Sequence, residues 1–148
     1  LDAGGDLDAV VLAMAGLQRI GLLRKLGGRV RPLPVERMIP AAGQGALAVQ
    51  CRRDDPVLTP LLRRIDDPSA GWRLACERAV LRRLGADCHS CVAVHVAQGE
   101  RGWRALAMVA DSDGGRGVRC EVEVPAVADA ATAVLDALSE SGRNRVGC

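Results

Sequence analysis

The sequence is poor in aromatic residues and in lysine. It contains no Phe, no Tyr and two Trp, and Lys25 is the only lysine among its 20 basic residues. A coding genome rich in G and C accounts for this bias without any functional meaning. The functional alternative is that planar guanidinium groups bind carboxylates through two parallel hydrogen bonds, as an enzyme with a polycarboxylate substrate requires. The composition alone favours the first explanation.

Long hydrophobic runs and an excess of one charge are also missing. No apolar stretch reaches the roughly 18 residues that a membrane-spanning helix needs, and no basic and then apolar leader opens the chain. The 18 acidic and 20 basic residues leave a formal charge of +2, which argues against a nucleic-acid or membrane partner. We expect a soluble protein. Because the chain starts at Leu1 and enters a strand-like segment at once, we also expect an N-terminal part to precede it.

The cysteines do not have the pattern of a disulfide scaffold. Three of them, Cys51, Cys76 and Cys120, lie inside apolar-periodic segments and are predicted to be buried free thiols. Full pairing of the six would allow about 15 connectivities. A reducing cytoplasm therefore fits better than a secreted location. The six are Cys51, Cys76, Cys88, Cys91, Cys120 and Cys148.

The first third of the chain has the signals of an α/β unit. The short apolar run at 8–14 predicts a buried strand, and 15–23 predicts a short helix. Glycine and proline at 27–34 indicate a connection. The weak alternation at 45–51 predicts a further strand.

The remainder predicts an α+β domain with a three-stranded antiparallel sheet covered by helices, over about 63–148. Acidic residues before Pro56 and Pro68 predict helices at 56–64 and 68–84, and Gly85 ends the second. Strands are expected at 91–97, 103–110 and 117–124, with a turn at 113–115 and a final helix at 126–139. In the helix at 68–84, the predicted apolar face contains Trp72, Leu74, Ala75, Ala79, Leu81 and Leu84, and Glu77 is assigned to the polar positions.

Cys88 is the strongest candidate for chemistry. It lies in LGADCHSCV (84–92), a loop between a helix and a strand, where Arg82 or Arg83 could stabilise a thiolate. Cys88 and Cys91 also form a C-x-x-C, so a zinc-binding or redox protein is an alternative, as is a non-catalytic binding module. The zinc alternative is weak because no second C-x-x-C or H-x-x-x-H supplies the remaining ligands. We therefore predict no metal site.

GQGALA (43–48) formally matches a variant of the dinucleotide-binding fingerprint. That fingerprint follows a strand and opens a helix, whereas this segment leads into a predicted strand. Glycines at an element boundary are the simpler interpretation. His89 and His95 are interpreted as a loop histidine and a strand histidine.

Four segments, in this order and at about these separations, resemble porphobilinogen deaminases (hydroxymethylbilane synthases). They are LDAVVLAMAGLQRIGL (7–22), IPAAGQGALAVQCRRDD (39–55), ERAVLRRLGADC (77–88) and the final strands and helix. The resemblance implies three domains, two of them like periplasmic binding proteins and a third that carries a cofactor. It assigns 1–40 to the end of the second domain, 41–54 to a return segment to the first, 55–62 to a linker and 63–148 to the C-terminal cofactor-carrying domain.

The same resemblance implies a cytoplasmic, monomeric transferase of tetrapyrrole and haem biosynthesis. Four porphobilinogen molecules join head to tail, each losing ammonia, and hydrolysis releases hydroxymethylbilane. Cys88 matches the family's cysteine that holds the dipyrromethane cofactor through a thioether. The residues that match positions around cofactor, porphobilinogen or the growing polypyrrole chain are Leu12, Ala13, Gly16, Arg19, Gln44 and Gly45.

The resemblance has two departures and one gap. Family loops have Gly-Gly before the cysteine and a proline three residues after it, whereas here Ala86 and Asp87 precede Cys88, and Cys91 replaces the proline. An aspartate beside the thiol opposes its ionisation. The family's catalytic aspartate lies in the first domain, so this chain has no catalytic acid or base. It is expected to be inactive without the N-terminal domains.

Overall fold

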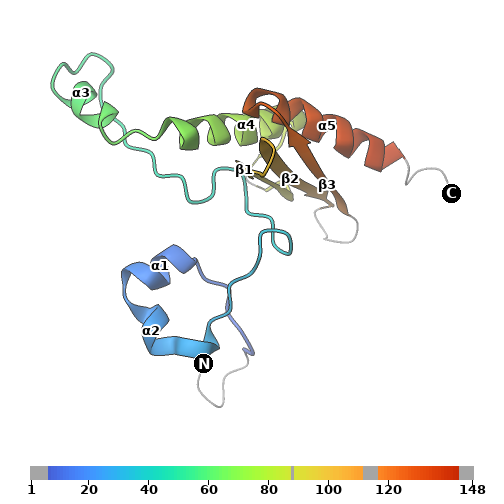
Figure 1. Cartoon of the computed structure of the whole chain (residues 1–148), viewed down its shortest axis with the longest axis horizontal. Helices are drawn as coiled ribbons and strands as arrows, with labels where there is room; N and C mark the ends of the chain where they lie inside the picture. Colours follow the sequence, from blue (N-terminus) through green and yellow to red (C-terminus); the bar gives the residue numbers. More distant parts are fainter. Residues whose placement is uncertain (1–6, 88, 112–116, 144–148) are drawn as a thin grey trace. The chain divides into compact units, whose positions relative to one another are not determined.

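The computed structural model describes residues 7–87, 89–111 and 117–143 (Figure 1). The chain divides into two compact units, Leu1–Pro34 and Val35–Cys148. No helix in the described ranges is long and apolar enough to cross a bilayer.

Within residues 7–34, the described part of the N-terminal unit, there are three short helical segments. They are α1 (Met14–Arg19), α2 (Leu22–Leu26) and the 3-10 helix η1 (Gly27–Arg29). The prediction of one helix over 15–23 was wrong in its continuity, because Gly21 adopts a left-handed conformation with φ of 69° between α1 and α2. Leu17 of α1 is buried.

The strands predicted at 8–14 and 45–51 do not form within the described chain. Neither segment forms the backbone hydrogen bonds of a β-sheet with another described segment. Their apolar side chains are exposed: Val11 at 65%, Leu47 at 82% and Val49 at 64%. A strand exists only when a neighbour accepts and donates its backbone hydrogen bonds. No described segment provides that neighbour, so the apolar pattern alone does not produce a strand.

The C-terminal unit confirms the α+β prediction. Strands β1 (Val92–Gln98), β2 (Trp103–Ala110) and β3 (Gly117–Val124) form an antiparallel sheet in the order β1-β2-β3. Helices α4 (Pro68–Leu84) and α5 (Val127–Arg143) pack against each other and against the sheet (Figure 1). β3 alternates as predicted, with Cys120 buried and Arg119 and Glu121 exposed. The turn predicted at 113–115 lies outside the described residues.

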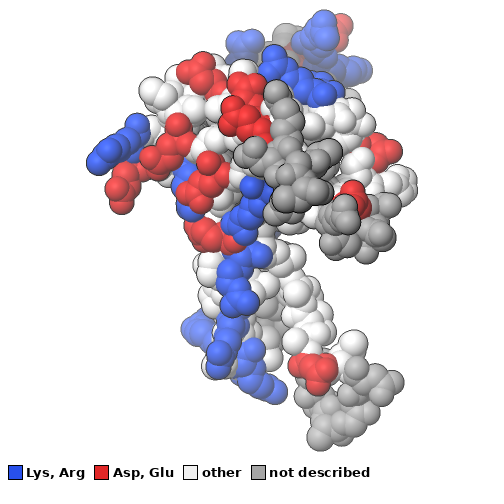
Figure 2. Space-filling model, turned by 90° about the vertical axis from the view of Figure 1, so that its right-hand side faces the viewer, with Lys and Arg blue, Asp and Glu red and all other residues white. Residues whose placement is uncertain are grey.

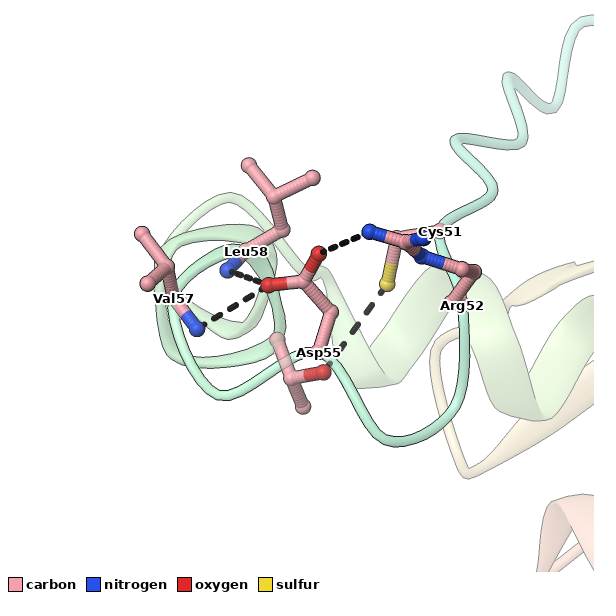
Figure 3. A network of polar contacts seen from close by, with 6 residues as sticks. Cys51, Arg52, Asp55, Val57 and Leu58 are labelled. Atoms are coloured by element: carbon pink, nitrogen blue, oxygen red, sulfur yellow. Dashed lines mark hydrogen bonds and ion pairs between the residues drawn. The ribbon is translucent and has the colours of Figure 1, made fainter.

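Local capping explains where the helices begin and end. The Asp67 carboxylate accepts the Ala70 N–H at 3.1 Å at the start of α4, and Gly85 ends the helix with φ of 64°. α3 (Leu58–Arg63) is shorter than predicted. Before it, Asp55 accepts the N–H groups of Val57 and Leu58 at 3.0 and 2.8 Å (Figure 3). The acidic cap predicted before Pro68 is therefore confirmed, whereas the N-cap residue of α3 is Val57 and not the predicted aspartate.

The core between helices and sheet is made of small and branched side chains. Val80, Val94, Val96 and Val134 are at most 1% exposed and form one cluster with buried alanines. The predicted apolar face of α4 is partly wrong, because Trp72 is 57% exposed whereas Glu77 is buried. Because α4 is rich in alanine and arginine, its sequence does not show clearly which face is apolar. The face that packs against the sheet contains Cys76, Glu77 and Val80.

Part of the other face of the sheet is covered by residues 35–40, which follow the predicted connection at 27–34. Ile39 and Val35 pack against Ala93 and Leu106. Arg104 of β2 donates to Glu36 and to Glu121 of β3, at 2.6 Å each. This segment therefore belongs to the C-terminal unit and fixes residues 35–40 beside the sheet.

Candidate functional site

The loop that contains Cys88 joins α4 to β1. Cys88 itself lies outside the described residues, so its predicted role stays a prediction. Its neighbours are held by hydrogen bonds: the Asp87 carboxylate accepts the His89 N–H at 2.9 Å and the Ser90 hydroxyl at 2.8 Å, and the Asp87 N–H donates to Ser90 Oγ at 3.0 Å. The Ser90 hydroxyl and the His89 N–H lower the pKa of Asp87. The loop therefore keeps a carboxylate anion next to residue 88.

Arg83, one of the candidate cations, and Cys91, the second cysteine of this loop, contact different elements. Arg83 donates to Thr132 Oγ1 of α5 at 3.1 Å, so it ties α4 to α5. Cys91 is exposed, and its carbonyl accepts the Ala110 N–H at 2.9 Å. Among the described residues, no group of three or more His, Cys, Asp or Glu could hold a metal ion.

Residues 41–46, here called the glycine turn, contain two of the predicted site residues. The Gln44 N–H donates to the Ala41 carbonyl at 3.0 Å, and the Ala46 N–H donates to the Gly43 carbonyl at 3.1 Å. Gly43 and Gly45 have φ of 76° and 85°, which other residues adopt only under strain. These are two consecutive β-turns and no helix follows, so the dinucleotide fingerprint is accidental. The turns leave Gln44 and Gly45 exposed.

Glu77 is a functional candidate that sequence analysis missed. Its side chain is buried, at 7% exposure, and no described cation forms an ion pair with it. One carboxylate oxygen accepts the Gly43 N–H at 2.6 Å, and the other accepts the Val96 N–H of β1 at 2.9 Å. The available signal was its position three residues before Val80 and next to Cys76, which places it on the buried stripe of α4.

A hollow of about 210 Å³ lies between the glycine turn, α4 and β1. Gln44, Gly45 and Glu77 all line this hollow. The residues that line it are Gly43, Gln44, Gly45, Ala46, Ala70, Arg73, Leu74, Glu77, His95 and Val96.

The other predicted ligand-binding residues lie in the N-terminal unit. Ala13 caps α1 and accepts the Gly16 N–H at 3.0 Å, Leu12 precedes it at 59% exposure, and Arg19 is the exposed last residue of the helix. Residues 9–34 contain five basic residues and no acidic one. Figure 2 shows the Lys and Arg side chains of this unit as an almost continuous band. Such a surface attracts anions.

These features place the chain among α+β proteins that present a cysteine loop, a glycine turn and a basic helical segment. Residues 1–59 match the family model "Porphobilinogen deaminase, dipyromethane cofactor binding domain". The chain is 42% identical over 110 residues to the porphobilinogen deaminase of Streptococcus sanguinis, with 74% of this chain and 36% of that protein covered. It is 40% identical over 122 residues to that of Pelobacter propionicus, covering 81% and 38%.

The chain belongs to the porphobilinogen deaminase family. It spans little more than a third of the length of the curated relatives that it matches. Any stretch of 110 residues in this chain includes residues 39–110, so the match to the Streptococcus protein extends across both the glycine turn and the Cys88 loop.

Proposed function

We propose that the chain is the C-terminal part of a transferase that joins four porphobilinogen molecules into hydroxymethylbilane and releases ammonia. The observation that carries the proposal is the match to porphobilinogen deaminases, which includes the Cys88 loop. The zinc or redox alternative lacks a comparable observation. In the proposed domain organisation, 1–40 ends a second periplasmic-binding-protein-like domain, 41–54 returns to the first, 55–62 is a linker and 63–148 carries the cofactor.

Cys88 is the proposed attachment residue for dipyrromethane. A thiol in a loop between a helix and a strand fits a thioether, which survives repeated turnover because water does not cleave it as it would a thioester. When bound, the dipyrromethane supplies the primer from which the chain of pyrroles grows. The hydrogen bonds of Asp87 with His89 and Ser90 hold the backbone on both sides of the attachment point.

The basic N-terminal unit is the proposed site for the pyrrole carboxylates. Each pyrrole bears an acetate and a propionate, so every addition increases the negative charge. Arg19, exposed at the end of α1, would bind these groups by paired hydrogen bonds. Leu12, Ala13 and Gly16 would lie beside the same ligand. Gln44 and Gly45 would approach the ligand with amide and backbone groups.

The exposed apolar segments support the proposal that the chain acts with further domains. Val10 and Val11, and likewise Leu47 and Val49, are more than half exposed. In the longer protein these segments would complete strands of the first two domains. The acid or base for catalysis would come from there as well, since this chain has no matching residue. We place the parent enzyme in the cytoplasm as a monomer, without nucleic-acid or membrane partners.

Mass spectrometry of the parent holoenzyme tests the proposal. We expect the peptide that contains Cys88 to carry a mass increase of two pyrrole units, and the Cys88→Ser variant to lose both this adduct and its colour with Ehrlich's reagent. Cys91→Ser is the matched control, because it removes the other thiol of the same loop and should keep the adduct. An unmodified Cys88 in an active parent, or an adduct on Cys91, would refute the assignment.

A further inference from the structure

We propose that Glu77 is a positioning residue for the glycine turn. Its carboxylate holds residues 41–46 against β1, and it thereby sets where Gln44 and Gly45 meet the polypyrrole. The inference rests on the proposed function of these two residues. Glu77 itself is buried and lies behind the turn.

The two oxygens of Glu77 join segments that are far apart in the sequence. The Gly43 N–H and the Val96 N–H each donate to one of them, at 2.6 and 2.9 Å. These bonds span 34 and 19 residues. A carboxylate that accepts two backbone N–H groups forms strong, charge-assisted hydrogen bonds in a fixed geometry. Glu77 is therefore a rigid link between the turn and the sheet.

The edge of β1 explains why this link is needed. β1 is an outer strand, so some of its backbone groups point away from β2. The Val94 N–H donates to the Pro40 carbonyl at 3.1 Å, and the Val96 N–H donates to Glu77. Among the described residues, one backbone hydrogen bond, between Val94 and Pro40, joins this edge to the segment that enters the glycine turn. Further along the edge, the Glu77 carboxylate accepts the Val96 N–H, which a neighbouring strand would otherwise accept.

The turn has a second support in Leu74. A Cβ atom added to Gly43 would lie 2.9 Å from Leu74 Cδ1, so the side chain packs directly against this glycine. Leu74 lies three residues before Glu77 on α4, and both line the hollow next to Gln44. The same helix therefore holds the turn by one polar and one apolar contact.

The test uses the full-length parent holoenzyme with the variants Glu77→Gln and Leu74→Ala. Glutamine keeps the shape but has one acceptor oxygen, and its NH₂ group cannot accept the second backbone N–H. We expect KM for porphobilinogen to rise about tenfold in Glu77→Gln, with kcat changed less, because the defect lies in ligand placement. Hydrogen exchange at the Gly43 amide should accelerate while the Val94 amide stays protected. Leu74→Ala should raise KM less, in the same direction.

Glu140→Gln is the matched control, since it removes an exposed carboxylate from α5 and should leave both constants unchanged. The inference is overturned if Glu77→Gln folds with unchanged KM, or if exchange at Gly43 does not accelerate. Should Glu77→Gln fail to fold, Leu74→Ala decides: faster exchange at Gly43 with unchanged KM overturns the inference. A wild-type parent without porphobilinogen turnover refutes the proposed function instead.

Discussion

The thiols illustrate how strongly single residues depend on their surroundings. Cys76 and Cys120 are buried, and desolvation raises the pKa of both; the Glu77 charge adds to this effect for Cys76. Cys91 is exposed. Only the thiolate reacts with alkylating agents, so burial slows the reaction of Cys76 and Cys120 both by blocking access and by opposing their ionisation.

We therefore expect iodoacetamide at neutral pH to modify Cys91 at least about tenfold faster than Cys76 or Cys120. Peptide mapping over a time course measures the three rates. In guanidinium chloride the differences should disappear, because unfolding exposes every thiol. Equal rates in the folded protein would contradict the burial of Cys76 and Cys120.

At the scale of elements, helices pack on one face of the sheet, and residues 35–39 cover part of the other. Leu106 of β2 is 1% exposed and packs against Ile39 on the face opposite the helices. Met108, two residues further along the same face, is 37% exposed. The two side chains share a strand and a direction but differ in burial.

Leu106→Ala should lower the free energy of unfolding by about 3 kcal/mol, because it removes buried apolar surface and leaves a cavity. Met108→Ala is its control and should cost less than about 1 kcal/mol. Urea denaturation followed by circular dichroism measures both values. Similar costs for the two variants would show that residues 35–39 do not cover this face.

At the scale of the whole molecule, Arg104 links the 35–40 segment, β2 and β3 through its bonds to Glu36 and Glu121. The hydrogen bond from Arg104 lowers the pKa of each glutamate. A carboxyl group with a lowered folded-state pKa stabilises the fold above its unfolded pKa of about 4.3. That stabilisation is lost as the pH falls through the folded-state value.

We expect the free energy of unfolding to decrease from about pH 5 downward, and to decrease less in Arg104→Gln, where the two glutamates lose their hydrogen bonds from the Arg104 guanidinium. Chemical denaturation at pH 7, 5 and 3 measures the slopes. Arg101→Gln, at an exposed arginine in the turn between β1 and β2, is the control and should retain the wild-type slope. An unchanged slope in Arg104→Gln would contradict the role of this link.

The sequence by itself determined the features that depend on neighbours along the chain. Asp67, Pro68 and Gly85 define both ends of α4, since capping and left-handed glycine are local effects. The alternation of buried and exposed residues in β3 follows from the two-residue period of its sequence. The loop before β1 follows from the glycine that ends α4. The division of the predicted helix at 15–23 also had a local signal, Gly21.

Only the tertiary structure decided which polar groups are buried and which apolar runs become strands. Glutamate is usually a surface residue, yet the Glu77 carboxylate is buried and accepts hydrogen bonds from two backbone N–H groups that are distant in the sequence. The segments at 8–14 and 45–51 have the composition of strands, yet no described partner completes them. Burial and strand pairing join residues far apart in sequence, so their energies do not appear in any local pattern.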